Sequence, residues 1–347
     1  MLNENAVIAR LLAWYDAHKR DLPFRGTRDP YRVWVSEIML QQTRAQTVIP
    51  YYQRFLQRFP DVQTLALARE EEVLKLWEGL GYYSRARMLH KTAGIVAQSG
   101  FPTTEQGLRE LPGIGPYTAA AIASIAFGQP VPAIDGNLTR VLARLYHIEE
   151  NVRIPSVARL LRQYGENLMP PDRPGDMNQA LMDLGATLCV PGTPECDQCP
   201  LSQLCVAFNE GEPETLPVLP DARPPKPIPM AVALVTHQDQ VLLIQRREKL
   251  LHNLYVFALC EGQDDEASAA RHLKHLGLSV QAGQPLGSAR HVFTHRVWQM
   301  ELYHFEAAAP TPVPHGLWAT AQQLQALPIP TAMKVARQQA LHILSDK

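Results

Sequence analysis

The 347-residue sequence has almost no net charge, few cysteines and no uninterrupted apolar run that could cross a membrane. Its formal net charge is −1, so the overall charge predicts no polyanionic partner. Four of the five cysteines lie between residues 189 and 205, which argues against a distributed disulfide framework. The stretches 111–134 and 307–333 contain no Asp, Glu, Lys or Arg, but prolines and glycines interrupt both. We therefore expect no membrane span, and the absence of a secretory signal predicts a cytoplasmic protein.

The residues that are present indicate a folded protein with unevenly distributed charge. Hydrophobic residues make up 46% of the chain and charged residues 19%, which excludes a disordered, collagen-like or coiled-coil protein. Residues 10–58 hold nine Arg or Lys against four Asp or Glu, whereas residues 149–210 hold four against nine. A nearly neutral protein can therefore present a basic face to a nucleic acid, although ordinary solvated helix charge explains the same counts.

The chain divides into a helical part and a part rich in strands. Apolar residues at helical spacing, with Asp29 and Pro30 as a cap and first-turn proline, predict successive helices without strands over residues 1–209. Seven prolines within seventeen residues favour an extended linker, which we assign to residues 210–229. Alternating apolar and polar residues after it, with two helices, predict an α+β domain at residues 230–347.

The most specific motif is a run of four cysteines with the pattern Cys-x6-Cys-x2-Cys-x5-Cys, formed by Cys189, Cys196, Cys199 and Cys205. Four thiolates this close in sequence can enclose one metal centre. A zinc site with four thiolates is the alternative, but such sites often use two Cys-x2-Cys pairs, whereas this run has one. The spacing favours an iron–sulfur cluster and leaves zinc open. Cys260 stands apart and is expected to be an ordinary thiol.

A glycine-containing segment, LPGIGPYTAAAIASIAFG at residues 111–128, predicts two helices joined by a tight hairpin. Gly113 and Gly115 would let the backbone turn and expose its N–H groups at a helix N-terminus, which suits a phosphate oxygen. A plain connection between two helices is the alternative. Asp135 follows in AIDGNLTRVLARL, where an aspartate before a helix is first of all a standard N-cap.

Glu37 is a further candidate for chemistry. At helical spacing its neighbours form a mostly apolar face, made of Val33, Trp34, Leu40 and Gln41. A carboxyl group in an apolar pocket has a raised pKa, which is the condition for a general acid near neutral pH. An exposed helix glutamate is the ordinary alternative, and the helix pattern alone favours it.

Together these motifs resemble the helix–hairpin–helix DNA glycosylases of the endonuclease III superfamily, and among them the MutY-type adenine DNA glycosylases. The shared segments are LPFR (22–25), SEIMLQQT (36–43), GLGYYSRAR (79–87), LPGIGPYTAAAI (111–122), DGN (135–137), NQALMDLGA (178–186) and the four-cysteine run. The resemblance implies an all-α helix–hairpin–helix lobe with a six-helix part at about 20–130. It also implies that residues 1–19 and 131–209 form a part that carries one 4Fe–4S cluster.

The implied function is base excision repair: removal of adenine mispaired with 8-oxoguanine or guanine in duplex DNA, by a monomer associated with the nucleoid. The resemblance assigns Glu37 as the acid that protonates adenine N7, and Asp135 as the carboxylate that stabilises the oxocarbenium ion or a covalent intermediate. Tyr117 and Asn137 correspond to positions that orient Asp135 and the pocket. Bifunctional relatives carry a lysine where this chain has Tyr117, so a monofunctional glycosylase is expected.

The same resemblance implies particular DNA contacts. Gly113 and Gly115 would hold a phosphate, and a monovalent cation is a further candidate ligand there. Gln42 and Tyr82 would enter the base stack near the lesion. Arg25 lies close to the pocket in the family. The cysteine loop VPGTPE lacks the family's basic residues, so candidates to compensate, by position alone, are Arg25, Arg44, Arg85, Arg87 and Arg140.

Residues 230–347 resemble a Nudix domain without its catalytic carboxylates. When Arg271 is aligned with the arginine of the Nudix motif, the glutamate positions hold His272, His275 and Leu276. These side chains do not supply the oxygen ligands that a hard divalent cation requires. A nucleotide pyrophosphatase is therefore an improbable alternative function.

The resemblance instead implies a lesion-reading domain, in which Phe293, Thr294 and His295 approach 8-oxoguanine. Thr294 stands where the family usually has serine, so the hydroxyl is kept and a methyl group is added. A non-catalytic lesion-binding protein is the remaining alternative. Such a protein would not need to keep both Glu37 and Asp135.

Overall fold

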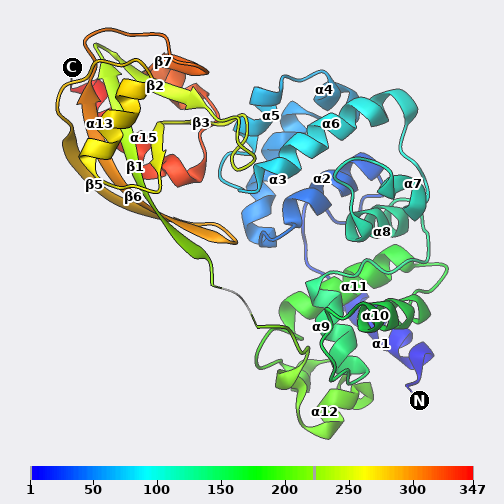
Figure 1. Ribbon diagram of the computed structural model, residues 1–347. Coiled ribbons are helices and arrows are strands. Elements are labelled where there is room, and N and C mark those ends of the chain that lie inside the picture. Colours follow the sequence, from blue (N-terminus) through cyan, green and yellow to red (C-terminus); the bar gives the residue numbers. More distant parts are fainter. Residues whose placement is uncertain (1, 222–223, 347) are drawn as a thin grey trace. The chain divides into compact units, whose positions relative to one another are not determined.

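The computed structural model describes residues 2–221 and 224–346, which form two compact units (Figure 1). The first unit contains the described residues up to 67 and those from 88 to 221. The second unit contains residues 68–87 and the described residues after 223. Met1, Lys347 and the expected linker residues 222 and 223 lie outside the described residues.

Residues 2–209 form helices and no strands, as the sequence predicts. The helices are α1 (Glu4–His18), α2 (Pro30–Leu40), α3 (Ala45–Arg58), α4 (Val62–Ala66), α5 (Glu70–Leu76), α6 (Tyr83–Ser99), α7 (Glu105–Arg109), α8 (Pro116–Ile125), α9 (Gly136–Leu145), α10 (Pro155–Asn167), α11 (Pro174–Thr187) and α12 (Val206–Glu210). In the first unit α2 packs against α3 and α8, and α9 packs against α10, α11 and α12. Helix α11 also contacts α1 and α8, so it joins these two groups of helices.

The segment expected to be a uniform linker contains elements of both units. Leu216 is buried, and its carbonyl oxygen accepts a hydrogen bond from Nε of Arg144 at 3.0 Å. Val218 accepts a backbone hydrogen bond from Val152, so this part of the segment packs on the helical unit. The first strand of the next domain begins at Lys226. The linker prediction is therefore wrong at both ends, because prolines also suit a buried extended segment and an exposed strand end.

The C-terminal domain is α+β, as predicted. Its strands are β1 (Lys226–His237), β2 (Gln240–Gln245), β3 (Tyr255–Val256), β4 (Ala258–Glu261), β5 (Gln284–Val292), β6 (Arg296–Glu306) and β7 (Gly316–Thr320), and its helices are α13 (Glu266–His275), α14 (Ala321–Ala326) and α15 (Lys334–Ser345). The main sheet order is β3-β2-β1-β6-β5. Strands β1 and β6 run parallel, whereas β1 pairs antiparallel with β2 and β4, so the sheet is mixed.

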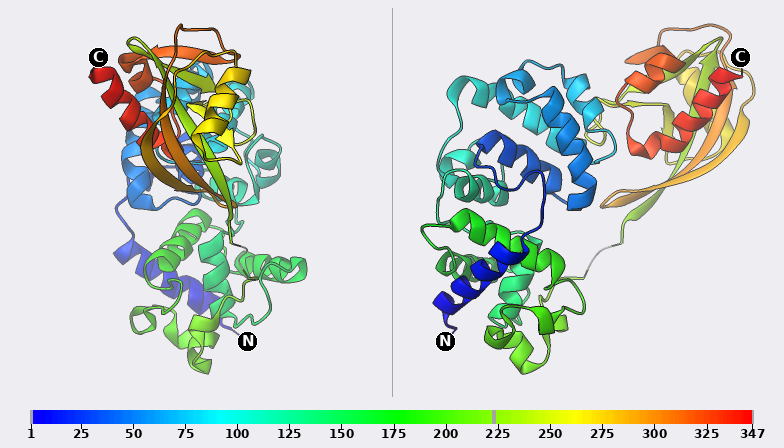
Figure 2. Two further views of the ribbon diagram at one scale, coloured as in Figure 1. Left: turned by 60° about the vertical axis from the view of Figure 1, so that its left-hand side comes forward. Right: turned by 180° about the vertical axis from the view of Figure 1, so that it is seen from behind.

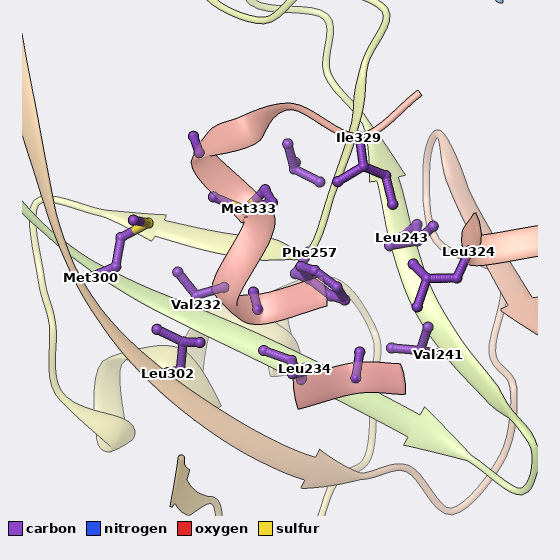
Figure 3. Packing of buried hydrophobic residues seen from close by; sticks show 14 of the residues in the cluster. Val232, Leu234, Val241, Leu243, Phe257, Met300, Leu302, Leu324, Ile329 and Met333 are labelled. Atoms are coloured by element: carbon purple, nitrogen blue, oxygen red, sulfur yellow. The ribbon is translucent and has the colours of Figure 1, made fainter. Parts of the chain in front are cut away.

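Two apolar cores cover opposite faces of this sheet because successive side chains of a strand alternate between faces. Val232 and Leu234 of β1 contribute to a core with Met333 and with alanines of α15, as Figure 3 shows. Ala233 and Val235, the intervening residues, contribute to a core with side chains of α13. The left view of Figure 2 accordingly shows α15 (red) and α13 (yellow) on opposite sides of the sheet.

Residues 68–87, which the sequence analysis assigned to the helical lobe, contact the C-terminal domain within the second unit. Nδ2 of Asn253 donates to Oε1 of Glu70 at 2.7 Å, and the Tyr255 hydroxyl donates to Oε1 of Glu71 at 3.1 Å. Over residues 2–221 and 224–346, none of the helices has the length and apolar character needed to span a lipid bilayer.

Candidate active site and cysteine centre

Glu37 lies in α2 and is only 3% exposed. The Asp29 side chain caps the first turn by accepting the Tyr31 N–H at 2.9 Å, and Pro30 occupies the first helical position. Both features start the helix as the sequence predicts. Most of α2 beyond the cap is buried, so Glu37 is enclosed with its apolar neighbours. The exposed-glutamate alternative is therefore wrong.

Tyr117 contacts this buried carboxyl group. Its hydroxyl donates a hydrogen bond to Oε2 of Glu37, from the first turn of α8. The pKa of Glu37 is raised above its usual value, chiefly because burial disfavours the charged form. The hydrogen bond from Tyr117 and the charge of Arg25 oppose this rise, whereas the charge of Asp135 adds to it. The resemblance implies that Tyr117 orients Asp135, but the hydroxyl of Tyr117 donates its hydrogen bond to Glu37 instead.

Asp135 is the N-cap of α9, and its charge acts on both Glu37 and Tyr117. Its Oδ1 accepts the Leu138 N–H at 2.7 Å, and its Oδ2 accepts Nδ2 of Asn137 at 3.0 Å. Burial raises the pKa of Asp135, and these hydrogen bonds oppose the rise. The structural and the chemical interpretations of Asp135 therefore do not compete, since the cap fixes the carboxylate in place.

Arg140 does not have the exposed position expected of a DNA contact. It is 8% exposed, and its Nε donates to the Cys189 carbonyl oxygen at 2.7 Å. Its Nη2 donates to Oδ1 of Asn137 at 2.8 Å and to the Gly185 carbonyl oxygen at 2.7 Å. The expectation for Arg140 is wrong, because a helical position does not reveal that the side chain turns inward. Arg140 instead holds Asn137, which in turn contacts Asp135.

Arg25, whose charge acts on Glu37, is held by an acidic residue for which the sequence predicts no role. Nη2 of Arg25 lies 2.9 Å from Oδ1 of Asp183, whose side chain is 1% exposed. Arg20 binds the same carboxylate oxygen at 2.6 Å. The sequence signal for Asp183 is its place between two apolar residues in the family motif NQALMDLGA. The sequence does not show which arginines pair with it.

The two glycines of the hairpin differ in backbone conformation and in the space around them. Gly113 has a φ of +77°, and a Cβ atom at this position would lie 2.4 Å from Cβ of Met88. Gly115 is the N-cap of α8 with a φ of −83°, and a Cβ atom there would meet nothing within 4 Å. The turn therefore requires glycine at 113 only, which corrects the expectation for both. Gly115 is exposed and leaves open space beside the helix N-terminus.

The four cysteines of the motif line one cavity together with apolar side chains of α9 and α11. All four are free thiols, and Cys260 lies apart in β4, as expected. Arg144 lies beside them: its Nη1 is 3.4 Å from Sγ of Cys189 and donates to the Val190 carbonyl oxygen at 2.8 Å. Burial raises the pKa of Cys199 to about 12.

Gln42 directly follows the C-terminal cap of α2 and is exposed. Its φ of +56° lies in the left-handed region, which a residue other than glycine rarely adopts. Tyr82, in the second unit, has a φ of +50° and is 47% exposed. The two residues expected to enter a base stack therefore share an unusual backbone conformation and an exposed side chain.

The predicted lesion-reading residues form the turn between β5 and β6. The backbone N–H of Phe293 donates to the Arg296 carbonyl oxygen at 2.8 Å and closes this turn. The Phe293 ring packs against Trp298, with ring centres 4.9 Å apart, whereas Thr294 and His295 are exposed. The Thr294 hydroxyl lies 3.2 Å from that of Tyr82. Phe293 therefore anchors the turn and its two neighbours present their side chains.

The helix that corresponds to the Nudix motif is α13. Nη2 of Arg271 donates to Oγ of Ser268 at 2.6 Å, and the carbonyl oxygen of Arg271 lies 2.7 Å from Nδ1 of His275. Both of these contacts of Arg271 are therefore with other residues of α13. In residues 2–221 and 224–346, no three His, Cys, Asp or Glu side chains converge on the position of a single metal ion.

Comparison with known proteins supports the same two-part organisation. A family model described as HhH-GPD superfamily base excision DNA repair protein matches residues 35–167, and a NUDIX domain model matches residues 230–339. Among solved structures, a thermostable thymine-DNA glycosylase matches 60% of this chain and 97% of its own, with 29% identity and a TM-score of 0.54. An endonuclease III–DNA complex has a TM-score of 0.51 over 60% of this chain and 98% of its own; at 22% identity this shows the shared fold.

Curated relatives extend the similarity over most of the chain. The adenine DNA glycosylase of Rattus norvegicus is 37% identical, covering 93% of this chain and 76% of the relative. The human enzyme is 35% identical, covering 93% and 72%. That of Buchnera aphidicola subsp. Acyrthosiphon pisum is 32% identical, covering 82% of each. The protein therefore belongs to the adenine DNA glycosylase family and is a DNA glycosylase, an enzyme that hydrolyses N-glycosyl bonds.

Proposed function

We propose that this protein is a monofunctional glycosylase that removes adenine mispaired with 8-oxoguanine or guanine from duplex DNA. The observation that carries the proposal is the hydrogen bond from Tyr117 to the buried carboxyl group of Glu37, on which the charge of Asp135 also acts. The Glu37 carboxyl group accepts one hydrogen bond, from Tyr117, whereas Asp135 accepts hydrogen bonds from the Leu138 N–H and from Asn137, which favour its ionised form. The proposal therefore assigns Glu37 as the acid and Asp135 as the anion, the two groups that cleavage of a glycosidic bond requires.

In the proposed reaction the adenine is turned out of the duplex into a pocket. The Glu37 carboxyl group gives its proton to adenine N7, and the C1′–N9 bond breaks with its electron pair going to the departing base. The deoxyribose is left with a cationic C1′, which the Asp135 carboxylate stabilises, directly or through a transient covalent bond. Water then adds to C1′, displacing the Asp135 carboxylate where a covalent bond has formed, and gives up a proton to the Glu37 carboxylate, which leaves an abasic site. Asn137 keeps Asp135 in place through its 3.0 Å hydrogen bond.

The proposal of a monofunctional enzyme rests on Tyr117. A bifunctional glycosylase uses a lysine amine to form a Schiff base with the sugar, and a phenol cannot form one. The hydroxyl of Tyr117 is instead used by Glu37. We therefore expect release of adenine without cleavage of the DNA strand.

We also propose that Cys189, Cys196, Cys199 and Cys205 hold one 4Fe–4S cluster. The four thiols line one cavity, and their spacing, with a single Cys-x2-Cys pair, favours an iron–sulfur cluster over a zinc site. Arg144 beside Cys189 supplies a positive charge suited to an anionic thiolate centre. When bound, the cluster would organise this loop and α9 rather than take part in breaking the glycosidic bond.

Duplex DNA is the proposed partner, bound by a monomer. Gly115 supports a phosphate contact, since it leaves open space at the N-terminus of α8, and a monovalent cation is a further candidate ligand at this hairpin. Thr294 and His295 are exposed at the β5–β6 turn, which suits a role in reading 8-oxoguanine. The exposed side chains of Gln42 and Tyr82 suit insertion beside the displaced base.

The test is single-turnover excision on a duplex with adenine opposite 8-oxoguanine, compared with adenine opposite guanine and opposite thymine. We expect release of adenine at the two mispairs and none at the normal pair. The Glu37→Gln variant should bind the same DNA and lose roughly 10²- to 10⁴-fold in rate, the usual contribution of general acid catalysis. Tight binding without base release by the unmodified protein would instead indicate a lesion-binding protein.

A further inference from the structure

Asp183 is a buried charged residue with no part in the proposed chemistry, and it pairs with Arg20 and Arg25. Its side chain lies in α11 and is 1% exposed. Its Oδ1 accepts Nε and Nη2 of Arg20 at 3.0 and 2.6 Å, and Nη2 of Arg25 at 2.9 Å. Its Oδ2 accepts the backbone N–H of Arg20 at 3.3 Å. A carboxylate with so many charge-assisted donors is held in one position.

Arg25 connects this carboxylate to the catalytic acid. Its side chain is 12% exposed, and its positive charge acts on Glu37. Nε of Arg25 is buried without a hydrogen-bond partner among the described residues. The ion pair with Asp183 is therefore the side-chain contact that fixes the guanidinium there.

We propose that Asp183 is a positioning residue of the glycosylase reaction: its carboxylate holds the Arg25 guanidinium beside Glu37. This inference rests on the proposed role of Glu37 as the general acid. The alternative is that Asp183 has a structural role only and ties the segment around Arg20 to α11. The two roles predict different effects on the pKa of Glu37, because only the positioning role acts through Arg25.

The expected effect on Glu37 has a definite sign. The groups that act on this carboxyl are Tyr117 of α8, Arg25 and Asp135 of the α9 cap. Replacing Asp183 by Asn leaves the guanidinium groups of Arg20 and Arg25 close together without their shared counter-charge, so Arg25 moves away. Loss of its charge raises the pKa of Glu37. If Arg25 stayed in place, removal of the negative charge alone would lower that pKa instead.

The experiment measures single-turnover excision against pH for the full-length protein and for Asp183→Asn. Only the protonated acid is active, so the rate falls as the pH rises through the pKa of Glu37. We expect Asp183→Asn to be roughly 10- to 100-fold slower near neutral pH, as for a misplaced catalytic group. The basic limb of its pH profile, where the rate falls as the pH rises, should lie at higher pH than in the unmodified protein. Arg25→Gln should shift the limb in the same direction. The double variant should shift it no further than either single variant.

Matched controls separate this result from a general loss of structure. Asp176→Asn removes another acidic residue of α11, one that is 42% exposed and paired with Arg173, and should leave the basic limb unchanged. Arg20→Gln leaves the pair between Arg25 and Asp183 intact and should also keep the limb near its original pH. Thermal unfolding of each variant reports whether it is folded.

A second readout does not depend on activity. The carboxyl stretching band of protonated Glu37, identified as the infrared band lost in Glu37→Gln, is titrated in each variant. A midpoint that rises in both Asp183→Asn and Arg25→Gln supports the proposal, even if the protein released no adenine. A midpoint that is unchanged or falls in Asp183→Asn overturns it. Should Asp183→Asn not fold, an unchanged midpoint in Arg25→Gln overturns it as well.

Discussion

The Tyr117 hydroxyl donates its hydrogen to Oε2 of Glu37, joining α8 to α2 inside the protein. Burial favours the protonated form of Glu37, and this hydrogen bond favours the ionised form. The pKa of the acid therefore depends on two opposing effects that belong to different parts of the fold. Without this hydrogen bond, Tyr117 would no longer oppose the rise in the pKa of Glu37 that burial causes.

Tyr117→Phe should raise the pKa of Glu37, because the hydrogen bond that stabilises its carboxylate is lost. Since the protonated acid is the active form, the basic limb of the excision rate should move to higher pH. The measurement is the single-turnover rate at a series of pH values, with Tyr146→Phe, a tyrosine that donates to Glu4, as the control. A basic limb that moved to lower pH would contradict this account of the pair.

Gly113→Ala and Gly115→Ala should separate folding from DNA binding. At Gly113 the added methyl group meets Met88 in a left-handed backbone conformation, so unfolding should become easier by about 1–3 kcal/mol. At Gly115 the methyl group meets no protein atom, so stability should change by less than about 0.5 kcal/mol. We expect Gly115→Ala to weaken DNA affinity nonetheless, by obstructing the phosphate. Urea unfolding and DNA titration test both variants, and unaltered affinity in Gly115→Ala would refute the phosphate assignment.

Thr294→Ala should reduce the preference for adenine opposite 8-oxoguanine over adenine opposite guanine. One hydrogen bond lost to the lesion corresponds to about 3- to 10-fold in that ratio. His295→Ala should act in the same direction, and excision opposite guanine should persist in both. The control is Val292→Thr, an exposed residue on the same hairpin. If the ratio stayed constant in both variants, the turn would not read the lesion.

Arg144→Gln should destabilise the cysteine loop. The Arg144 side chain is 2% exposed and donates to the carbonyl oxygens of Leu216, Val190 and Gly192. Its removal leaves these acceptors unsatisfied and should cost about 2–4 kcal/mol of unfolding free energy. We also expect a lower iron content per chain, measured by elemental analysis after purification. Arg159→Gln, at an exposed position of α10, should change neither quantity.

Local signals in the sequence account for most of the helical half. Asp29 with Pro30 marks the start of α2, and Asp135 marks the start of α9, because a cap depends on the residues beside it. Strand β5 has no comparable local signal. Residues of β5 are largely exposed and show little apolar alternation, so what defines this strand is pairing with β6.

The candidate site was predictable where chemistry and family motif coincide in one residue. The helix pattern alone favours an exposed Glu37, and only the family motif assigns it a role; its partner Tyr117 is 80 residues away in sequence. The sequence predicts no role for Asp183 and the wrong one for Arg140, for a related reason. A charged side chain on a helix is exposed by default, and only the fold reveals the carbonyl groups or guanidinium groups that make its burial possible.

The pairing of Arg25 with Asp183 also sets an order of events during protein synthesis. The two residues are 158 positions apart, so the ribosome delivers the guanidinium long before the carboxylate that holds it. Tyr15 of α1 likewise precedes its hydrogen-bond partner Gln179 by 164 positions. A nascent chain that already contains Glu37, Tyr117 and Asp135 therefore still lacks the helix that completes their surroundings. A chain truncated before α11 would carry the reacting groups without the assembled pocket.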